Sequence, residues 1–377
     1  EWRRIEDQYP TLFDNISPES VKQGNLGDCY FIISLIYASR HKDLVKLLFH
    51  PKSSLQYGVV LVYFWYLGEK IPVIVDTQVA YENSESENPF FSHPRTNEDS
   101  CWFVLVEKAY AKACGGYLQI ERGHVSFGMH ILFDFYSTDY SSLEDIIPAT
   151  SLKEKSEKKL NSNEKFFQIL QDLISKEALI GTSCPDEKIE NREELGLLTD
   201  HAYCILDARE SDDQKFVKLR NPWGTGKYNG EHEWTEKLKR DLDYKDGDDD
   251  GSFWMLLENY LFYFTSISYS LPKKKNWKEI SVYGKIDGYL DGRSPTTKSP
   301  HVGCIPQWSI KFTKKTIVRL SFDVAGPESS HGIYIVKNHS QKVDVIYVDT
   351  EMMRASTNSS VNGIEYKVND FSEPFTF

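Results

Sequence analysis

The sequence predicts an α+β fold, with a core of two lobes, one mainly helical and one rich in strands, followed by an antiparallel β-sandwich. Three observations predict this fold. Residues 30–36 are apolar on every face, which is typical of a helix enclosed by protein. After residue 166, segments with β-branched and aromatic residues dominate. Beyond residue 272, short alternating runs are separated by Gly, Pro and Ser, as in antiparallel sheets.

Residues 1–140 are the predicted first lobe. The apolar helix is at its centre, and β-branched stretches near 59–66 and 70–76 are predicted strands. A second helix is predicted over 101–114. The most apolar stretch, 57–67, is too short to cross a membrane, since a spanning helix needs about 20 residues.

Residues 141–271 are the predicted second lobe. Its first part, 141–165, is polar and contains the mixed charge run 153–159, which favours a solvated connector over a binding patch. An amphipathic helix is expected after residue 166. The strands predicted after it are 202–207, 216–220 and 253–257. This order predicts a sheet that faces the first lobe across a cleft.

Residues 272–377 are the predicted β-sandwich. Alternating runs such as 318–322 and 332–336 carry this prediction, and the basic stretch 273–275 precedes them. Three roles are open for this domain: docking of a regulatory protein partner, weak contact with a membrane, or bracing of the second lobe. The domain shows no dense acidic calcium loops, so bracing is at least as well supported as membrane contact.

Composition and charge exclude several classes of function. The 44 Lys and Arg residues stand against 56 Asp and Glu, so the net charge is 44 − 56 = −12, which disfavours a nucleic-acid partner. No Gly-rich phosphate-binding motif is present. The six cysteines are scattered without a CxxC pair, which indicates neither a zinc ribbon nor a dense disulfide framework. We therefore expect a protein of the reducing cytoplasm.

The segment Gln-Gly-Asn-Leu-Gly-Asp-Cys at 23–29 is the most informative motif. Its glycines allow a tight turn, Asp28 is a favourable N-cap, and Cys29 would lie in the first turn of the buried helix. Unpaired N–H groups and the helix dipole favour the thiolate there, so we expect a lowered pKa for Cys29. A lone cysteine is more often a buried structural residue. The assignment of Cys29 as a nucleophile therefore depends on its partners.

Two further residues supply those partners. His201 lies in a segment with strand character, and Asn221 lies where a strand ends in a Pro-directed turn. The order Cys, His, Asn is that of papain-like cysteine hydrolases, in which the imidazole transfers the proton and the Asn orients the ring. The separations, 201 − 29 = 172 and 221 − 29 = 192 residues, exceed the roughly 130–150 of papain itself.

The motifs around these residues resemble those of the calpain cysteine proteases. That family carries Gln-Gly-x-Leu-Gly-Asp-Cys-Trp, which this chain matches with Tyr30 in place of the Trp. The family's Leu-Leu-Glu-Lys-Ala-Tyr-Ala-Lys, His-Ala-Tyr, Arg-Asn-Pro-Trp-Gly and Asp-Gly-Glu-Phe-Trp-Met correspond here to 105–112, 201–203, 220–224 and 250–255. The C-terminal region resembles the calpain C2-like domain, but more weakly.

The resemblance implies a two-lobed papain-like core and a cysteine endopeptidase that acts on protein substrates. Cys29 would attack the scissile carbonyl, and His201 would transfer the proton. Asn221 would orient the imidazole, and the side chain of Gln23 would stabilise the oxyanion. The residues expected to contact substrate are Trp223 and Gly27.

Calcium is where the chain departs from the resemblance. Calpains bind one calcium in each lobe, with acidic ligands at positions that here hold Ser20, Lys227 and Ser252, and the segment 121–127 replaces another ligand loop. A lysine beside a hard cation repels it, so no cofactor is predicted to be required. The weak metal candidate that remains is Asp250, with Asp246, Asp248 and Asp249 beside it. Calcium is thus a possible cofactor but not a required one.

Two other functions stay open. One is a non-catalytic calpain-like scaffold for protein or membrane interaction, but a scaffold is free to lose the four predicted catalytic residues, and this chain retains all of them. The other is an acyltransferase with the same triad, which would need a cleft that accepts an amine. We favour the endopeptidase.

Overall fold

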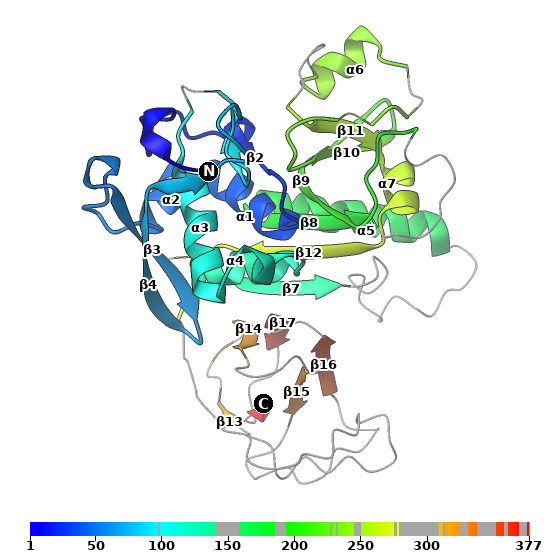
Figure 1. The fold of residues 1–377 in the computed structure, drawn as a ribbon. Coiled ribbons are helices and arrows are strands. Elements are labelled where there is room, and N and C mark those ends of the chain that lie inside the picture. The colour runs from blue at the N-terminus through cyan, green and yellow to red at the C-terminus, as the bar shows by residue number, and fades with distance from the viewer. Residues whose placement is uncertain are drawn as a thin grey trace. The chain divides into compact units, whose positions relative to one another are not determined.

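The structure of the protein is a computed structural model (Figure 1). It describes residues 1–96, 99–140, 158–184, 194–226, 228–230, 233–244, 250–274, 277–278, 309–311, 314, 316–323, 331–337, 352–357, 361–368 and 375–376. The chain divides into two compact units, Glu1–Pro272 and Lys273–Phe377, and each is described by itself. The residues named above that lie outside the described residues are 141–157, Lys227, Asp246, Asp248, Asp249 and Lys275.

The first half of unit 1 is mainly helical. The apolar run behind Cys29 forms α1 (Cys29–Ser39), and residues 30–39 are all buried, as an all-round apolar pattern predicts. The helix α3 (Trp102–Cys114) ends at Gly115, whose φ of 98° is a left-handed cap conformation that glycine favours. The other helices here are α2 (Lys42–Leu47), α4 (Val125–Phe133) and the short 3₁₀ helices Ile5–Asp7, Pro18–Ser20, Leu55–Tyr57 and Tyr117–Ile120.

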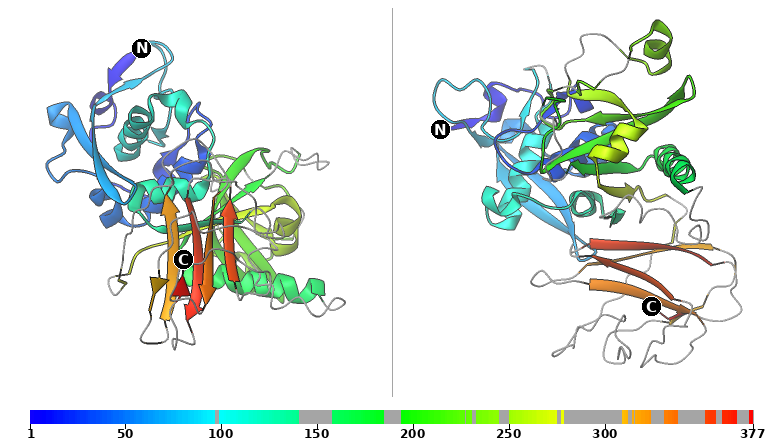
Figure 2. Two further views of the ribbon diagram at one scale, coloured as in Figure 1. Left: turned by 90° about the horizontal axis from the view of Figure 1, so that it is seen from below. Right: turned by 90° about the vertical axis from the view of Figure 1, so that its right-hand side faces the viewer.

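A β-hairpin packs against α3 and α4 (Figure 2). Strand β3 (Val59–Tyr66) pairs antiparallel with β4 (Glu69–Asp76), and its alternate residues Val60, Val62 and Phe64 are buried. Leu67 and Gly68 join the strands with φ of 51° and 74°, as a type I′ turn requires. The short strands pair as β1 (Trp2–Arg4) with β5 (Gln78–Ala80) and β2 (Val21–Lys22) with β6 (His93–Pro94).

The second half of unit 1 is built on an antiparallel six-stranded sheet, in the order β11-β10-β9-β8-β12-β7 (Figure 1). Its strands are β7 (Tyr136–Tyr140), β8 (Leu179–Cys184), β9 (His201–Ser211), β10 (Gln214–Arg220), β11 (Ser252–Leu256) and β12 (Ser266–Leu271). Its helices are α5 (Lys158–Ser175), α6 (Glu236–Asp241) and α7 (Leu257–Tyr263). The edge strand β7 comes from the end of the mainly helical half and pairs with β12.

Helices lie on both faces of this sheet, and β8 shows how they are divided. A Cβ at Gly181 would meet Val125 of α4 and Ile33 of α1, so this face lies against those two helices. The next residue, Thr182, accepts a hydrogen bond from the hydroxyl of Tyr260 on α7 at 3.0 Å. Neighbouring strand residues point to opposite faces, so α1 and α4 cover one face, and α7 covers the other together with α5 (Figure 2). The helix of the predicted nucleophile is thereby fixed on the sheet that includes β9.

Unit 2 consists of antiparallel strands wherever secondary structure is described. They are β13 (Ser309–Ile310), β14 (Thr316–Asp323), β15 (His331–Lys337), β16 (Met352–Thr357), β17 (Val361–Val368) and β18 (Phe375–Thr376). They form the groups β13-β18-β15-β16 and β14-β17. The mixture of helices and sheet in unit 1 confirms the α+β class of the core, whereas the β-sandwich stays a prediction. No helix in the described part of the chain is long and apolar enough to cross a membrane.

Candidate active site

The loop before the predicted nucleophile is fixed by a close backbone contact. A Cβ at Gly24 would come within 1.9 Å of the carbonyl oxygen of Phe91, so only glycine fits at this position. The helix α1 begins at Cys29, which is partly buried. The sulfur of Cys29 accepts a hydrogen bond from the backbone N–H of Ala202, near the start of β9. The candidate nucleophile therefore touches the strand that carries the candidate base.

The thiol of Cys29 is favoured over the thiolate. Burial raises its pKa, and this effect exceeds the lowering by the N–H groups of Ala202 and Tyr30. A negative charge on the neighbouring Asp28 would raise it further. The position at a helix terminus therefore does not lower the pKa of Cys29 as the sequence predicted, because desolvation outweighs the backbone donors. A second group has to accept the thiol proton when Cys29 reacts.

His201 and Asn221 are hydrogen-bonded to each other. Nε2 of His201, the first residue of β9, lies 2.9 Å from Oδ1 of Asn221, the residue that follows β10. The same Oδ1 accepts the backbone N–H of Trp223 at 3.0 Å, which fixes the orientation of the amide. An amide oxygen only accepts, so the neutral imidazole carries its proton on Nε2 and its lone pair on Nδ1. Burial lowers the pKa of His201, which favours this neutral, basic form.

Trp223 shields this pair from solvent. The rings of Trp223 and His201 meet edge to face, with centroids 5.4 Å apart and planes at 62°. Trp223 is 45% exposed, whereas Asn221 is 3% exposed, so the indole takes the outer position. A hydrogen bond sheltered from water is stronger, and the imidazole is therefore held more firmly in the orientation that Asn221 sets.

Gln23 links the loop of the nucleophile to the turn of Asn221. Its backbone N–H donates to the carbonyl of Pro222 at 3.0 Å, and its Nε2 donates to the carbonyl of Leu26 at 2.6 Å. The side chain is buried. A side-chain amide nitrogen carries two N–H donors, and one of them is left for an oxyanion after the bond to Leu26.

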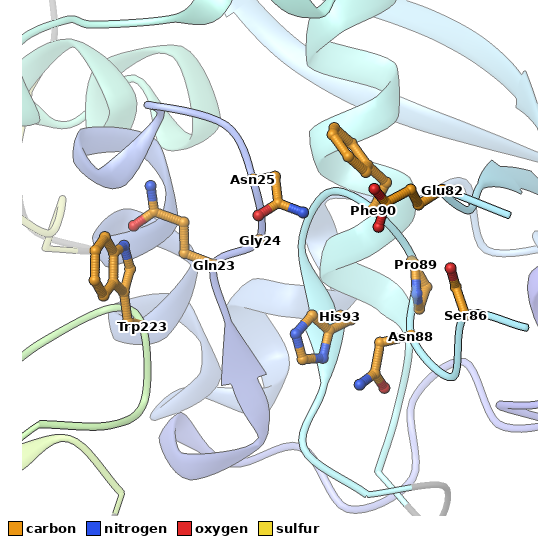
Figure 3. Close-up of a pocket in the computed structure, with 10 residues that line it drawn as sticks. All are labelled: Gln23, Gly24, Asn25, Glu82, Ser86, Asn88, Pro89, Phe90, His93 and Trp223. Atoms are coloured by element: carbon orange, nitrogen blue, oxygen red, sulfur yellow. The ribbon is translucent and has the colours of Figure 1, made fainter.

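Gly27 and a groove provide room for an extended chain. Gly27 is exposed, and no atom lies within 4 Å of the place where its Cβ would be. A groove with a volume of about 420 Å³ runs from Gln23 and Trp223 at one end to Glu82 and Ser86 at the other (Figure 3). Its remaining lining residues are Gly24, Asn25, Asn88, Pro89, Phe90 and His93. The groove begins at Gln23, the candidate oxyanion donor.

The side chain of Asp250, the candidate metal ligand, is engaged in other interactions. Oδ1 of Asp250 accepts the N–H and the hydroxyl of Ser252 at 2.8 and 2.6 Å, and Oδ2 lies 3.7 Å from Nη1 of the buried Arg220. Burial raises the pKa of Asp250, but these contacts lower it overall. The hydroxyl of Ser20 donates to the carbonyl of Ser17 at 2.7 Å. The described residues contain no group of three His, Cys, Asp or Glu side chains that could hold a metal ion.

One pair of residues at the site was not predicted from the sequence. Asp28 is the N-cap residue of α1, but its side chain makes no capping bond and instead hydrogen-bonds to Glu107 of α3. Both side chains are completely buried. For Glu107 the sequence held a clue, because this acidic residue interrupts the apolar run of α3. For Asp28 it held none, because the position of its side chain beside Glu107 depends on tertiary packing.

Comparisons with known proteins agree with the motifs. Residues 1–270 match the family model described as calpain family cysteine protease. The chain is 29% identical over 376 residues to calpain-5 of Mus musculus, which covers 87% of this chain and 54% of that protein. It is 28% identical over 328 residues to calpain-type cysteine protease ADL1 of Oryza sativa subsp. japonica, which covers 83% of this chain and 14% of that protein. The chain thus spans about half of calpain-5 and a small part of the plant protein.

Proposed function

Since the chain belongs to the calpain family of cysteine proteases, we propose that it is an endopeptidase with Cys29, His201 and Asn221 as its triad. One observation supports this mechanism best. His201 is hydrogen-bonded to Asn221 at 2.9 Å, and the next residue along β9, Ala202, donates its backbone N–H to the sulfur of Cys29. The bond leaves the lone pair on Nδ1 of His201, the proposed base for a thiol that burial keeps protonated. The three residues have the chemistry required of a nucleophile, a base and an orienting group.

The proposed reaction proceeds in two halves. The sulfur of Cys29 attacks the scissile carbonyl carbon while its proton moves to Nδ1 of His201. The N–H of Cys29, which has no partner inside α1, and the amide of Gln23 donate hydrogen bonds to the oxyanion. The imidazolium then protonates the leaving amine, and an acyl-enzyme remains. In the second half His201 takes a proton from water, and the oxygen of that water attacks the thioester carbon. The Cys29 sulfur leaves as a thiolate and takes the proton back from His201, which restores the resting site.

The proposed substrates are protein segments in an extended conformation. The exposed Gly27 permits close approach of a peptide backbone, and the polar groups of the groove offer hydrogen bonds to it. We propose limited proteolysis in the cytoplasm, without a required cofactor or a nucleic-acid partner. A regulatory protein, and weak membrane contact through residues 272–377, are the proposed further interactions.

Covalent labelling tests the proposed nucleophile. We expect a peptidyl epoxide to modify Cys29 alone among the six cysteines, because Cys29 is the thiol for which His201 is the proposed base. Mass spectrometry of the proteolysed, labelled chain identifies the modified residue. Cys114, an exposed thiol, is the internal control for non-specific alkylation. Labelling at Cys204, or none at any cysteine, would contradict the proposal, and absence of labelling would favour the non-catalytic scaffold.

We further propose that calcium does not control this site. A ligand shifts a conformational equilibrium only when it binds one state better, and Asp250 is already engaged by Ser252 and Arg220. We therefore expect micromolar calcium to leave cleavage unchanged relative to a chelator. Calorimetric titration of the Cys29→Ser protein measures binding directly. A stoichiometric isotherm that disappears in Asp250→Asn would show that Asp250 holds calcium together with oxygens outside the described residues.

A further inference from the structure

Two acidic side chains meet in the interior directly beneath the nucleophile. Asp28 and Glu107 are both fully buried and hydrogen-bond to each other. Two carboxylates cannot form a hydrogen bond unless one of them carries a proton, since an ionised carboxylate only accepts. Two bare charges at this depth would also repel strongly. The pair therefore holds at least one proton.

The surrounding donors show which residue carries the proton. The backbone N–H of Ser92 lies 3.2 and 3.1 Å from the two oxygens of Glu107, and the hydroxyl of Ser92 lies 2.7 Å from Oε2. These donors stabilise an ionised Glu107. Apart from the backbone N–H of Asp28 itself, no N–H or O–H donor of the described residues serves its carboxyl oxygens. A neutral Asp28 that donates to Glu107 satisfies both groups.

We infer that Asp28 is a neutral carboxylic acid that donates its proton to Glu107 and thereby positions Cys29. The bond ties the residue before the nucleophile to α3, and Glu107 ties α3 to Ser92. Ser92 follows Phe91, whose carbonyl oxygen contacts Gly24. One buried carboxylate thus connects the residue at the start of α1 to the wall of the groove.

The proton on Asp28 also affects the reactivity of the thiol. A charged Asp28 would raise the pKa of Cys29. Keeping Asp28 neutral removes this repulsion and makes the transfer of the thiol proton to His201 easier. This consequence rests on the proposed role of Cys29, whereas the acid pair itself does not.

The pair should lose its hydrogen bond when Asp28 ionises. Burial raises the pKa of Asp28, and the charge of Glu107 raises it further, while burial raises the pKa of Glu107 to about 7. The other titratable groups that face the pair are Cys29, Tyr30, Tyr117 and Glu121. A carboxyl group with a raised pKa in the folded state contributes stability that is complete below its unfolded pKa and is lost as the pH rises through the folded value. The hydrogen bond between Asp28 and Glu107 is therefore lost as the pH rises through the raised pKa of Asp28.

Infrared spectroscopy of the full chain tests the protonation state directly. At mildly alkaline pH, where Glu107 is ionised, we expect the wild-type spectrum to contain the carbonyl band of one buried carboxylic acid. The band should be absent in Asp28→Asn and present in Asp43→Asn, which changes an exposed aspartate of α2. A wild-type spectrum without the band, or a band that persists in Asp28→Asn, would overturn the inference.

The rate of alkylation of Cys29 by iodoacetamide tests the positioning role. An amide at residue 28 still donates to Glu107, so Asp28→Asn should retain the neutral-pH rate within a few-fold. Asp28→Ala should be slower by on the order of tenfold. Equal defects in the Asn and Ala variants would contradict positioning by this hydrogen bond. If the infrared band is present but Cys29 reacts no faster than Cys114, the proposed nucleophile is wrong and the acid pair stands.

Discussion

Replacement of Cys29 by Ser is expected to lower kcat/KM for an unstructured protein substrate by at least about 10⁴-fold. The hydroxyl is a much weaker nucleophile than the thiolate, and the orientation of His201 by Asn221 does not compensate for that difference. The melting temperature should change little, because the side chain is only partly buried and Ser differs from Cys by one atom. Steady-state cleavage assays and thermal unfolding of the same preparations measure both quantities.

Cys114→Ser is the matched control for this substitution. It makes the same chemical change at an exposed thiol at the C-terminal end of α3, so neither activity nor melting temperature should respond. Substantial activity left in Cys29→Ser would show that another group attacks the substrate. A large fall in melting temperature would show that Cys29 is a structural residue.

Replacement of His201 by Ala is expected to reduce kcat/KM nearly as much as loss of the nucleophile. Without Nδ1 the proposed base is lost, and the thiol, whose pKa burial has raised, keeps its proton. Asn221→Ala should cost about 10- to 100-fold less, since the Asn contributes orientation and the imidazole still carries the proton. The ratio of the two kcat/KM values is the measurement. Equal losses would indicate misfolding or a different base.

Asn221→Asp separates orientation from general disruption of the turn. A carboxylate oxygen accepts the same two hydrogen bonds, from Nε2 of His201 and from the N–H of Trp223. We expect it to recover part of the activity lost in Asn221→Ala. Its negative charge should raise the pKa of His201, so the acidic limb of the pH profile should move to higher pH. No recovery together with an unshifted profile would argue against the orienting role of Asn221.

The local sequence pattern determined most of the fold class and the positions of the main elements. The all-round apolar run predicted a buried helix over 30–36, and α1 extends from Cys29 to Ser39. The strands predicted near 59–66 and 70–76 appear as Val59–Tyr66 and Glu69–Asp76. These predictions depend on periodicity and on turn residues within about ten positions, which is the range in which sequence acts directly on the backbone.

The motifs also identified the residues of the candidate site, although His201 and Asn221 lie 172 and 192 residues after Cys29 in the chain. Sequence order alone does not bring the start of α1 to β9, the strand that begins with His201. This arrangement depends on the packing of α1 on the sheet, where Gly181 leaves room for Ile33. The bond between His201 and Asn221 likewise depends on the antiparallel pairing of β9 with β10.

Only the tertiary structure decided the charge states. The sequence placed Asp28 as an ordinary N-cap and predicted a lowered pKa for Cys29, and both expectations treated the helix terminus as an isolated, solvated element. Burial beside Glu107 instead favours a neutral Asp28, and burial raises the pKa of the thiol. The physical reason is that the types and spacing of residues act locally, whereas the energy of a charge depends on all the groups that folding brings around it and on the water that folding removes.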